Sequence, residues 1–577
     1  MKKLFAAVFL ASLCLNALCA DYNIKTDPVL KAMRLQNAAA IKALKKAKTP
    51  VYFLSYQLTD SYELFISSVL GGAKNVENRR RLFDVEARAG SRKMDNTRKI
   101  KEISFDSFYR QGSVPAPLED DIPALRRVFW LHTEEAVKKA QEMYQKVKTN
   151  SRTASQRGDD SDDFSAPLPP AKHYETAVIP QIDIAALKEM LAGYSLLFKG
   201  YDFILTSFAS LSINIDNIYY VNSEGAELKT PRVLMRMSFS ITSRNKDGMQ
   251  LERNVSYDFT ALKDLPAPAK VRADIQKAIE ELKALKDAPA AEPYHGPVLL
   301  KNKATGVFFH EILGHRVEGH RQKDDDFGQT FTQKLNQQVI SPLISVRDNP
   351  NLKEFKGIPL RGYYLYDDEG VRAQDAVIIK DGALKGFLMG RNPIKGFPQS
   401  NGHGRKEAGN NTVSRMGVTI VEANETVPYD TLRRMLVDEV KKQGKPYGLL
   451  IDDIAGGFTN TDTGGPQSFK VKPLLVYRVY ADGRPDEIIR GADIVGTPLA
   501  SFNKIIAAAD DSGVFNGSCG AESGWVPVSA VAPSILVSEM EIEKVDKTYD
   551  SLPLLPAPSA ARPAGAPDKT AKGAERI

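Results

Sequence analysis

Apolar and polar residues alternate between Met235 and Ile241, and this pattern constrains the fold most. Successive side chains of a strand point to opposite faces of a sheet, so the run predicts a strand with one face in a core and the other in water. Antiparallel sheets commonly have one wet face. Helical patterns occur elsewhere, but without a regular strand–helix–strand rhythm. We therefore expect an α+β protein with largely antiparallel sheets.

Hydrophobic periodicity and turn residues locate the main elements. Two short strands, at 51–58 and 62–70, are expected before the turn signal Gly71-Gly72. The remaining expected elements are helices with apolar residues at three- and four-residue steps, over 28–46, 121–148, 182–197, 268–287 and 429–443.

Composition divides the 577 residues into segments. An N-terminal α+β domain is expected over 21–287, with an exposed linker or insertion at about 150–175, where aspartates and prolines cluster. A Pro/Ala-rich stretch begins at Ala288, and a β-rich C-terminal domain is expected over 288–545. Residues 546–577 form a Pro/Ala-rich tail with too little apolar surface to order itself, so the tail should be dispensable.

The N-terminus has the pattern of a secretory signal peptide over residues 1–20. Two lysines precede the apolar run from Leu4 to Leu18, and Ala20 precedes Asp21. The run is too short to span a bilayer, so we expect export to the periplasm or medium and no stable membrane insertion after cleavage. Cleavage removes two lysines and no acidic residue, and lowers the formal charge from +7 to +5. With 78 basic and 71 acidic residues and no basic stripe, nucleic acid is not an expected partner.

Three of the seven histidines lie within eleven residues, at His310, His315 and His320, and Glu311 follows the first of them. Neutral imidazoles are preferred nitrogen ligands of zinc, and an adjacent carboxylate can act as a base on a water bound to zinc. Residues five apart on an ideal helix lie about 140° apart in projection, against about 40° for residues four apart. His310 and His315 can therefore share one metal only if the helix bulges or ends near Gly314.

A catalytic zinc needs a third protein ligand, and local spacing does not identify it. Cys519 is the only cysteine left after cleavage at residue 20, and it lies between Gly517-Ser518 and Gly520. Most free cysteines are small buried hydrophobes. A lone thiol in an exported protein gains protection when it binds metal, which favours a ligand role for Cys519.

Over roughly residues 182–542, the sequence resembles the TldD/PmbA metallopeptidases, specifically the metal-bearing TldD type. The matching segments are Asn222–Gly225, Gly296–His315, Asp367–Gly370, Asn401–Arg415, Gly491–Gly496, Cys519-Gly520 and Val526–Val528. The resemblance implies that His310, His315 and Cys519 bind Zn²⁺, that Glu311 is the base, and that the substrate is an unfolded or extended peptide. It also implies a two-domain subunit in a homodimer or a hetero-oligomer with a related subunit.

The resemblance is incomplete in several places. His320 stands where an acidic residue is expected, and Trp525 stands where a smaller residue is usual. The region from Arg110 to Tyr174 and the tail look like additions, and most members of the family lack an export signal.

The sequence therefore predicts an exported zinc metallopeptidase with Glu311 as general base. One alternative is a non-catalytic, metal-containing peptide-binding subunit, which would not need Glu311. Another treats Cys519 as a nucleophile with a histidine base, although no residue that would orient the base is evident in the sequence.

The roles of the neighbouring polar residues are less constrained. His320 is expected at the surface rather than behind the ligands. Glu318 either orients a ligand histidine or is a solvated charge. Asp367 and Asp368 precede Glu369-Gly370, which favours a role in a turn.

Overall fold

The computed structural model describes residues 23–100, 112–153, 159–323, 327–461, 463, 468–496 and 502–545. The expected signal peptide and the tail lie outside these residues. No helix in the described part of the chain combines the length and the apolar character needed to cross a bilayer.

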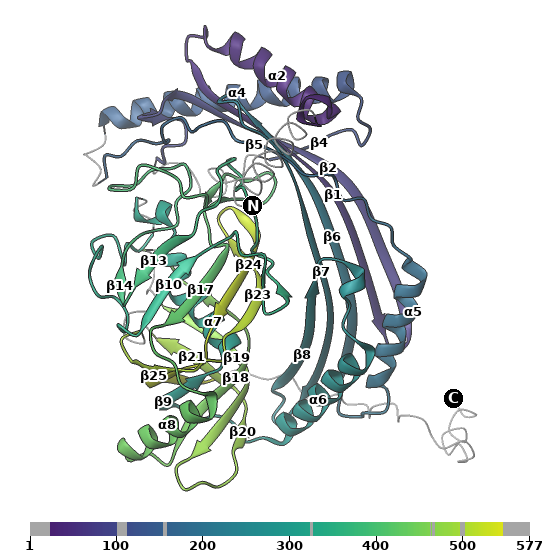
Figure 1. The fold of residues 1–577 in the computed structure, drawn as a ribbon, viewed down its shortest axis with the longest axis vertical. Helices are drawn as coiled ribbons and strands as arrows, with labels where there is room; N and C mark the ends of the chain where they lie inside the picture. Colours follow the sequence, from purple (N-terminus) through teal and green to yellow (C-terminus); the bar gives the residue numbers. More distant parts are fainter. Residues whose placement is uncertain are drawn as a thin grey trace, which may run out of the picture.

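A long, curved and largely antiparallel sheet dominates the N-terminal half, and its concave side faces the C-terminal half (Figure 1). Its path is β3-β2-β1-β6-β7-β5, with β4 paired to β2 and β8 paired to β7. The strands are β1 (Val51–Val69), β2 (Gly72–Ser91), β3 (Met94–Asp95), β4 (Val114–Pro115), β5 (Lys172–Tyr174), β6 (Thr206–Asn222), β7 (Glu227–Arg244) and β8 (Gln250–Phe259).

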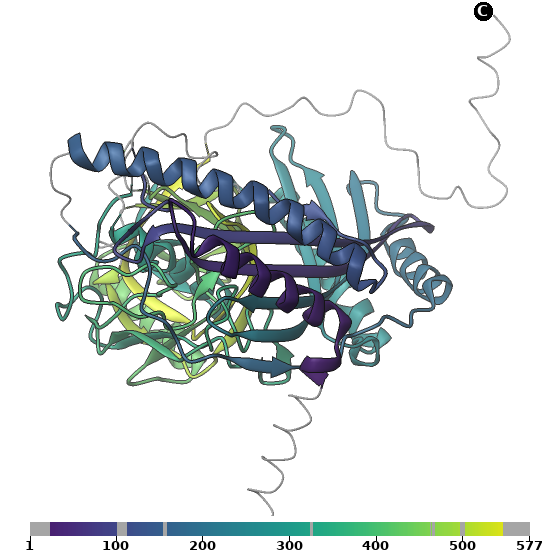
Figure 2. The ribbon, with the colours of Figure 1, turned by 90° about the horizontal axis from the view of Figure 1, so that it is seen from above.

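The alternation in β7 behaves as predicted. Met235, Met237, Phe239 and Ile241 are buried, while the residues between them are only partly buried. The buried face packs against α5 (Ile184–Ser195) and α6 (Pro268–Asp287), which lie on the convex side of the sheet. At the other end of the sheet, α2 (Pro28–Leu44) and α4 (Ile122–Thr153) lie across the strands (Figure 2).

The prediction of two short strands over 51–58 and 62–70 is wrong, because β1 is continuous through the polar residues between them. Asp60 pairs with Arg81 of β2 and Asn217 of β6 in the ladder. Its carboxylate also binds the buried Arg81 guanidinium at 2.9 Å. The polar residues thus have partners on the neighbouring strands and do not interrupt the strand.

The expectation of an exposed linker at about 150–175 is wrong for its central described residues. Asp163, Phe164 and Ser165 are buried against the body of the protein. The Phe164 ring lies between the guanidinium groups of Arg88 on β2 and Arg391 in the C-terminal half, at 3.8 and 4.0 Å from the ring centre. This segment therefore joins the two halves of the molecule.

Two larger sheets and two short hairpins make up the C-terminal half, which begins at β9. The six-stranded sheet contains β10 (Ile344–Asp348), β13 (Ala376–Lys380), β14 (Ala383–Leu384), β17 (Val418–Ala423), β23 (Gly513–Ala521) and β24 (Gly524–Ala532). The seven-stranded sheet contains β9 (Tyr294–Leu300), β18 (Tyr447–Thr459), β19 (Phe469–Tyr480), β20 (Glu487–Ile489), β21 (Ala492–Gly496), β22 (Ile505–Ala508) and β25 (Ile535–Lys544). The hairpins pair β11 (Glu354–Phe355) with β12 (Ile358–Pro359), and β15 (Gly404–Arg405) with β16 (Val413–Ser414).

Most strand pairs are antiparallel, and the parallel pairs among the described residues are β5–β7, β9–β18 and β17–β24. The fold is thus α+β with largely antiparallel sheets, as predicted. α8 (Tyr429–Lys442) packs on β9, β18 and β25, and α7 (Asn302–Ile312) packs against strands of both large sheets. α7 is buried from Ala304 to Ile312 and carries the first residues of the histidine motif.

Candidate metal centre

The α-helix that carries His310 ends before it reaches His315. α7 stops at Ile312, and Gly314–Arg316 form a single 3₁₀ turn. A Cβ atom on Gly314 would lie 2.0 Å from the Sδ atom of Met416, which is itself buried. A side chain at position 314 would therefore have to displace Met416, and the end of the helix removes the 140° separation that a regular helix would impose.

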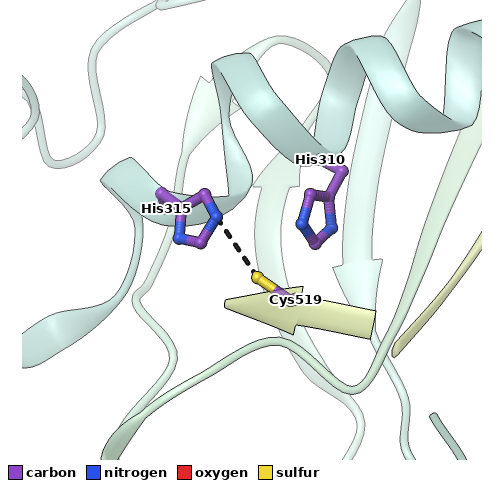
Figure 3. Close-up of side chains that lie close together, drawn as sticks. All are labelled: His310, His315 and Cys519. Atoms are coloured by element: carbon purple, nitrogen blue, oxygen red, sulfur yellow. Dashed lines mark hydrogen bonds between the residues drawn. The ribbon is translucent and has the colours of Figure 1, made fainter. Parts of the chain in front are cut away.

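His310, His315 and Cys519 converge on one point (Figure 3). Each can offer one donor atom such that all three atoms lie within 4.8 Å of one another. The Sγ atom of Cys519 is 3.3 Å from Nε2 of His315, and the two imidazole ring centres are 5.3 Å apart. Cys519 comes from β23, more than 200 residues from the histidines. All three residues are buried.

The surrounding charges favour the thiolate form of Cys519. Burial alone would raise the pKa of the thiol, but His315, His310 and Arg415 together hold that pKa well below its ordinary value. The thiolate is the form that binds metals.

Glu318 is fully buried and fixes the orientation of His315. Its Oε2 atom lies 3.2 Å from Nδ1 of His315 and accepts a hydrogen bond from Nε of Arg321 at 2.8 Å. Burial opposes ionisation of Glu318, but His315 and Arg321 outweigh it and lower the pKa to about 2. A carboxylate on the far nitrogen of a ligand histidine sets its tautomer and ring orientation. Of the two roles left open for Glu318, the structure shows the orienting one.

His320 is not a surface residue, so that expectation is wrong. Its side chain is 8% exposed and its Nε2 atom contacts the Glu522 carboxylate. Glu318, His320 and Glu522 lie close enough to suggest a second metal site. However, the guanidinium of Arg321 lies between the two carboxylates and bonds to Glu522 at 2.7 Å. This cluster is therefore neutralised by an arginine.

Arg415 joins the two chain segments that carry the metal-ligand candidates. It is fully buried, and its Nη2 atom donates to the Cys519 carbonyl at 2.7 Å. Its Nη1 atom donates to Ser523 in the β23–β24 turn, and its Nε atom lies 3.5 Å from Glu318 Oε1. Arg415 thus holds the β23–β24 hairpin against the turn that carries His315.

Glu311 lies beside the three donors, where the backbone of β18 covers it. A Cβ atom on Gly457 would lie 2.4 Å from Cγ of Glu311, so only glycine fits there. Among the described residues, no group donates a hydrogen bond to the Glu311 carboxylate. Burial raises its pKa above the ordinary value, and the nearby histidines only partly oppose this shift. A carboxylate with free lone pairs and a raised pKa is suited to accept a proton.

The donor set fits zinc. Two imidazoles and one thiolate form the three-ligand arrangement that leaves a position open for catalysis. His315 also has the carboxylate partner that metal-binding histidines usually have. If zinc binds there, His310, His315 and Cys519 are the residues that hold it.

Sequence reasoning located the three donor candidates and Glu311, but not the charged residues behind them. Arg321, Arg415 and Glu522 carried no local signal, although Arg415 ends one of the segments that resemble the family. Asp367 has the expected turn role, because its Oδ1 atom accepts backbone hydrogen bonds from Glu369 and Val371. Trp525 is 65% exposed and lies over Gly520, on the face of the hairpin opposite to Cys519.

The fold and the His–His–Cys–Glu arrangement define the class as a metallopeptidase-like α+β protein. The model of the PmbA/TldA metallopeptidase C-terminal domain matches residues 293–544. The chain is 27% identical over 348 residues to a Haemophilus influenzae protein named metalloprotease TldD homolog, covering 58% of this chain and 67% of the relative. It is 25% identical over 327 residues to a Saccharolobus solfataricus protein named zinc metalloprotease TldD homolog, covering 56% and 68%.

The crystal structure of TldE from Thermococcus kodakarensis has the same fold, with a TM-score of 0.56 at 15% identity. That comparison covers 88% of this chain and all of the other. Residues 293–544 therefore carry the C-terminal domain of the PmbA/TldA metallopeptidases, and the chain is similar to the two TldD homologues over a little more than half of its length.

Proposed function

We propose that this protein is a zinc metallopeptidase that hydrolyses peptide bonds in unfolded or extended peptides. The observation that carries the proposal is the convergence of His310, His315 and Cys519 beside Glu311, to whose carboxylate no residue in the described part of the chain donates a hydrogen bond. A purely structural metal site would have no use for Glu311 in that position.

The chain's own residues account for the proton transfers. His310, His315 and Cys519 would hold the zinc, which would supply a Lewis acid and lower the pKa of the attacking water. Glu311 takes a proton from that water and later delivers it to the nitrogen of the departing amine. Glu318 keeps His315 in the tautomer whose Nε2 faces the metal position. Arg415 keeps Cys519 in register with the histidines.

We also propose that the protein is exported by residues 1–20 and that it assembles as a homodimer or with a related subunit. The apolar run at the N-terminus supports export, and the likeness to the TldE fold supports a related-subunit assembly. Sequencing of the mature N-terminus and light scattering of the purified protein test these two points. A mature chain that retains Met1, or a monomer at all concentrations, would contradict them.

A cysteine peptidase is the second candidate, because the structure supplies the orienting residue that the sequence did not reveal. Cys519, His315 and Glu318 form a connected series of contacts at 3.3 and 3.2 Å. Against this candidate, Cys519 is only 4% exposed, and His310 and Glu311 would then have no chemical role. The metallopeptidase mechanism uses all of these residues.

Metal removal and thiol alkylation separate the two mechanisms. The purified mature chain should contain one zinc ion and cleave a pool of unfolded peptides. A chelator should abolish cleavage, zinc should restore it, and iodoacetamide should have no effect on the zinc-loaded protein. Full cleavage after zinc removal, with inactivation by iodoacetamide, would overturn the proposal in favour of the cysteine mechanism.

A further inference from the structure

A cavity of about 320 Å³ lies between the concave face of the N-terminal sheet and the C-terminal half. Residues of β7 and β8 form one wall, and the segment around 359–368 together with Arg405 forms the other. None of His310, Glu311, His315 and Cys519 lines it. Ligand cavities range from about 300 to 1,000 Å³, so this one suits a small occupant.

Four basic side chains line the cavity, and only some of them form an ion pair with a carboxylate of their own. Arg232 pairs with Asp216 at 2.8 Å. Arg361 shares Asp258 with Arg236, which already binds that carboxylate through two nitrogens at 2.8 Å each. Among the described residues, Lys353 and Arg405 have no carboxylate within ion-pair distance. Lys353 and Arg405 are therefore the basic groups that an anion could pair with, although the carboxyl groups of Glu175, Asp258, Asp367 and Asp368 also line the cavity.

The two central arginines lie in a poorly hydrated environment. Arg405 is 4% exposed and stacks on the Tyr364 ring at 4.8 Å. Within the described ranges, its Nη1 atom donates to the backbone carbonyls of Met416 and Pro527 and to no other group. The Nε atom of Arg361 is buried without a hydrogen-bond partner. Burial, reinforced by neighbouring arginines, lowers the pKa of both side chains. A bound anion would relieve this repulsion.

The rest of the lining restricts the kind of anion. Tyrosine, leucine and proline side chains form much of the wall, so part of the occupant should be apolar. Four acidic residues, Glu175, Asp258, Asp367 and Asp368, also line the cavity, and their carboxylates would repel a doubly charged phosphate more than a monoanion. Their oxygens can instead accept N–H groups of an occupant. A carboxylate with an adjacent amide and an apolar side chain satisfies all three features.

We propose that this cavity binds the carboxylate end of a short peptide, with Arg361, Arg405 and Lys353 facing the carboxylate. The choice of a peptide over other small acids rests on the proposed function. Planar guanidinium groups match carboxylates through two parallel hydrogen bonds, which makes arginine suited to this contact. The cavity would hold the free end of a substrate or a cleavage product, apart from the zinc ligands.

Calorimetry with defined probes tests the proposal without requiring hydrolysis. The protein is the full mature chain, zinc-loaded and carrying Glu311→Gln so that no probe is consumed. The probes are N-acetyl-leucyl-phenylalanine, its C-terminal amide and phenylacetate. The free acid should bind at least about 10-fold more tightly than the amide, because the charge-assisted hydrogen bonds are lost in the amide. Phenylacetate, which lacks the backbone amides, should bind more weakly than the dipeptide acid.

Variants assign the binding to the cavity. Arg361→Gln should weaken binding of the acid by about 10-fold, while Asp258 stays paired through Arg236. Arg347→Gln removes a surface arginine that pairs with Asp375 and Glu422, and it should leave binding unchanged. Lys353→Gln changes an exposed residue that should not affect folding, and it should weaken binding even if Arg361→Gln proves unstable.

Three results would overturn the proposal. Equal affinity for acid and amide would exclude a carboxylate site. Unchanged affinity in Arg361→Gln and Lys353→Gln would place the binding elsewhere. Phenylacetate binding as tightly as the dipeptide would replace the peptide with a small free acid. Because binding is measured without turnover, a failed hydrolysis assay leaves this test intact, and the reverse also holds.

Discussion

Replacing Glu318 by glutamine should weaken the metal centre although Glu318 is not itself a proposed ligand. The change keeps the size of the side chain but removes the negative charge that faces His315, Arg321 and Arg415. Loss of a carboxylate partner of a ligand histidine typically costs 10- to 100-fold in metal affinity. Leaving buried arginines without their carboxylate should also cost about 3 kcal/mol of unfolding free energy.

Zinc affinity is measured by competition with a chelator, and stability by chemical denaturation. Because the pKa of Glu318 is lowered to about 2, its contribution to stability is present above about pH 4.5 and is lost as the pH falls towards 2. The advantage of the wild type over Glu318→Gln should shrink over that range. The control is Glu422→Gln, whose side chain is 52% exposed in a surface ion pair. Wild-type zinc affinity in Glu318→Gln would refute the orienting role.

Three further perturbations follow from the packing. Burial, reinforced by Glu86, raises the pKa of Glu369 to about 7, so the folded state binds the proton more tightly. The free energy of unfolding should therefore fall as the pH rises from about 4.5 to 7. Denaturation of Glu369→Gln at both pH values should show a smaller change. An equal change in wild type and variant would contradict the raised pKa of Glu369. Phe164→Ala should lower the free energy of unfolding, measured by denaturation, by about 3 to 5 kcal/mol. The control Phe458→Ala changes a side chain that is 70% exposed and should lower it little. Similar losses in the two variants would refute the role of Phe164 between the halves. Gly314→Ala should lower zinc affinity because its Cβ would overlap Met416 Sδ. Adding Met416→Ala should restore part of the zinc affinity. A double variant that binds zinc no better than Gly314→Ala would show that the overlap is not the cause.

Features that depend on residues close together in the chain could be predicted from the sequence. The periodicity of residues 268–287 matches α6 to the residue, and the five-residue spacing of His310 and His315 correctly required a distortion or end of the helix. Both predictions rest on steric rules that act within a few residues.

The elements that sequence reasoning missed depend on partners far along the chain. Asp60 in β1 looked like a break, because polar residues usually end an isolated strand, yet it faces Arg81 on the next strand. The segment at 163–165 has the composition of an exposed loop and is buried because Arg88 and Arg391 meet around Phe164. Arg415 and Glu522 were missed for the same reason: Arg415 acts only once Cys519 and Glu318 are brought together, and Glu522 only once it meets Arg321.

The central claim is that Glu311 acts as the base of a zinc peptidase. Glu311→Gln keeps the size of the side chain and leaves His310, His315 and Cys519 untouched. Zinc content and the unfolding transition should match the wild type. Cleavage of an unfolded peptide by the zinc-loaded variant should fall at least about 100-fold, the lower end of what general-base catalysis contributes. Cleavage at the wild-type rate, with zinc in place, would contradict the account.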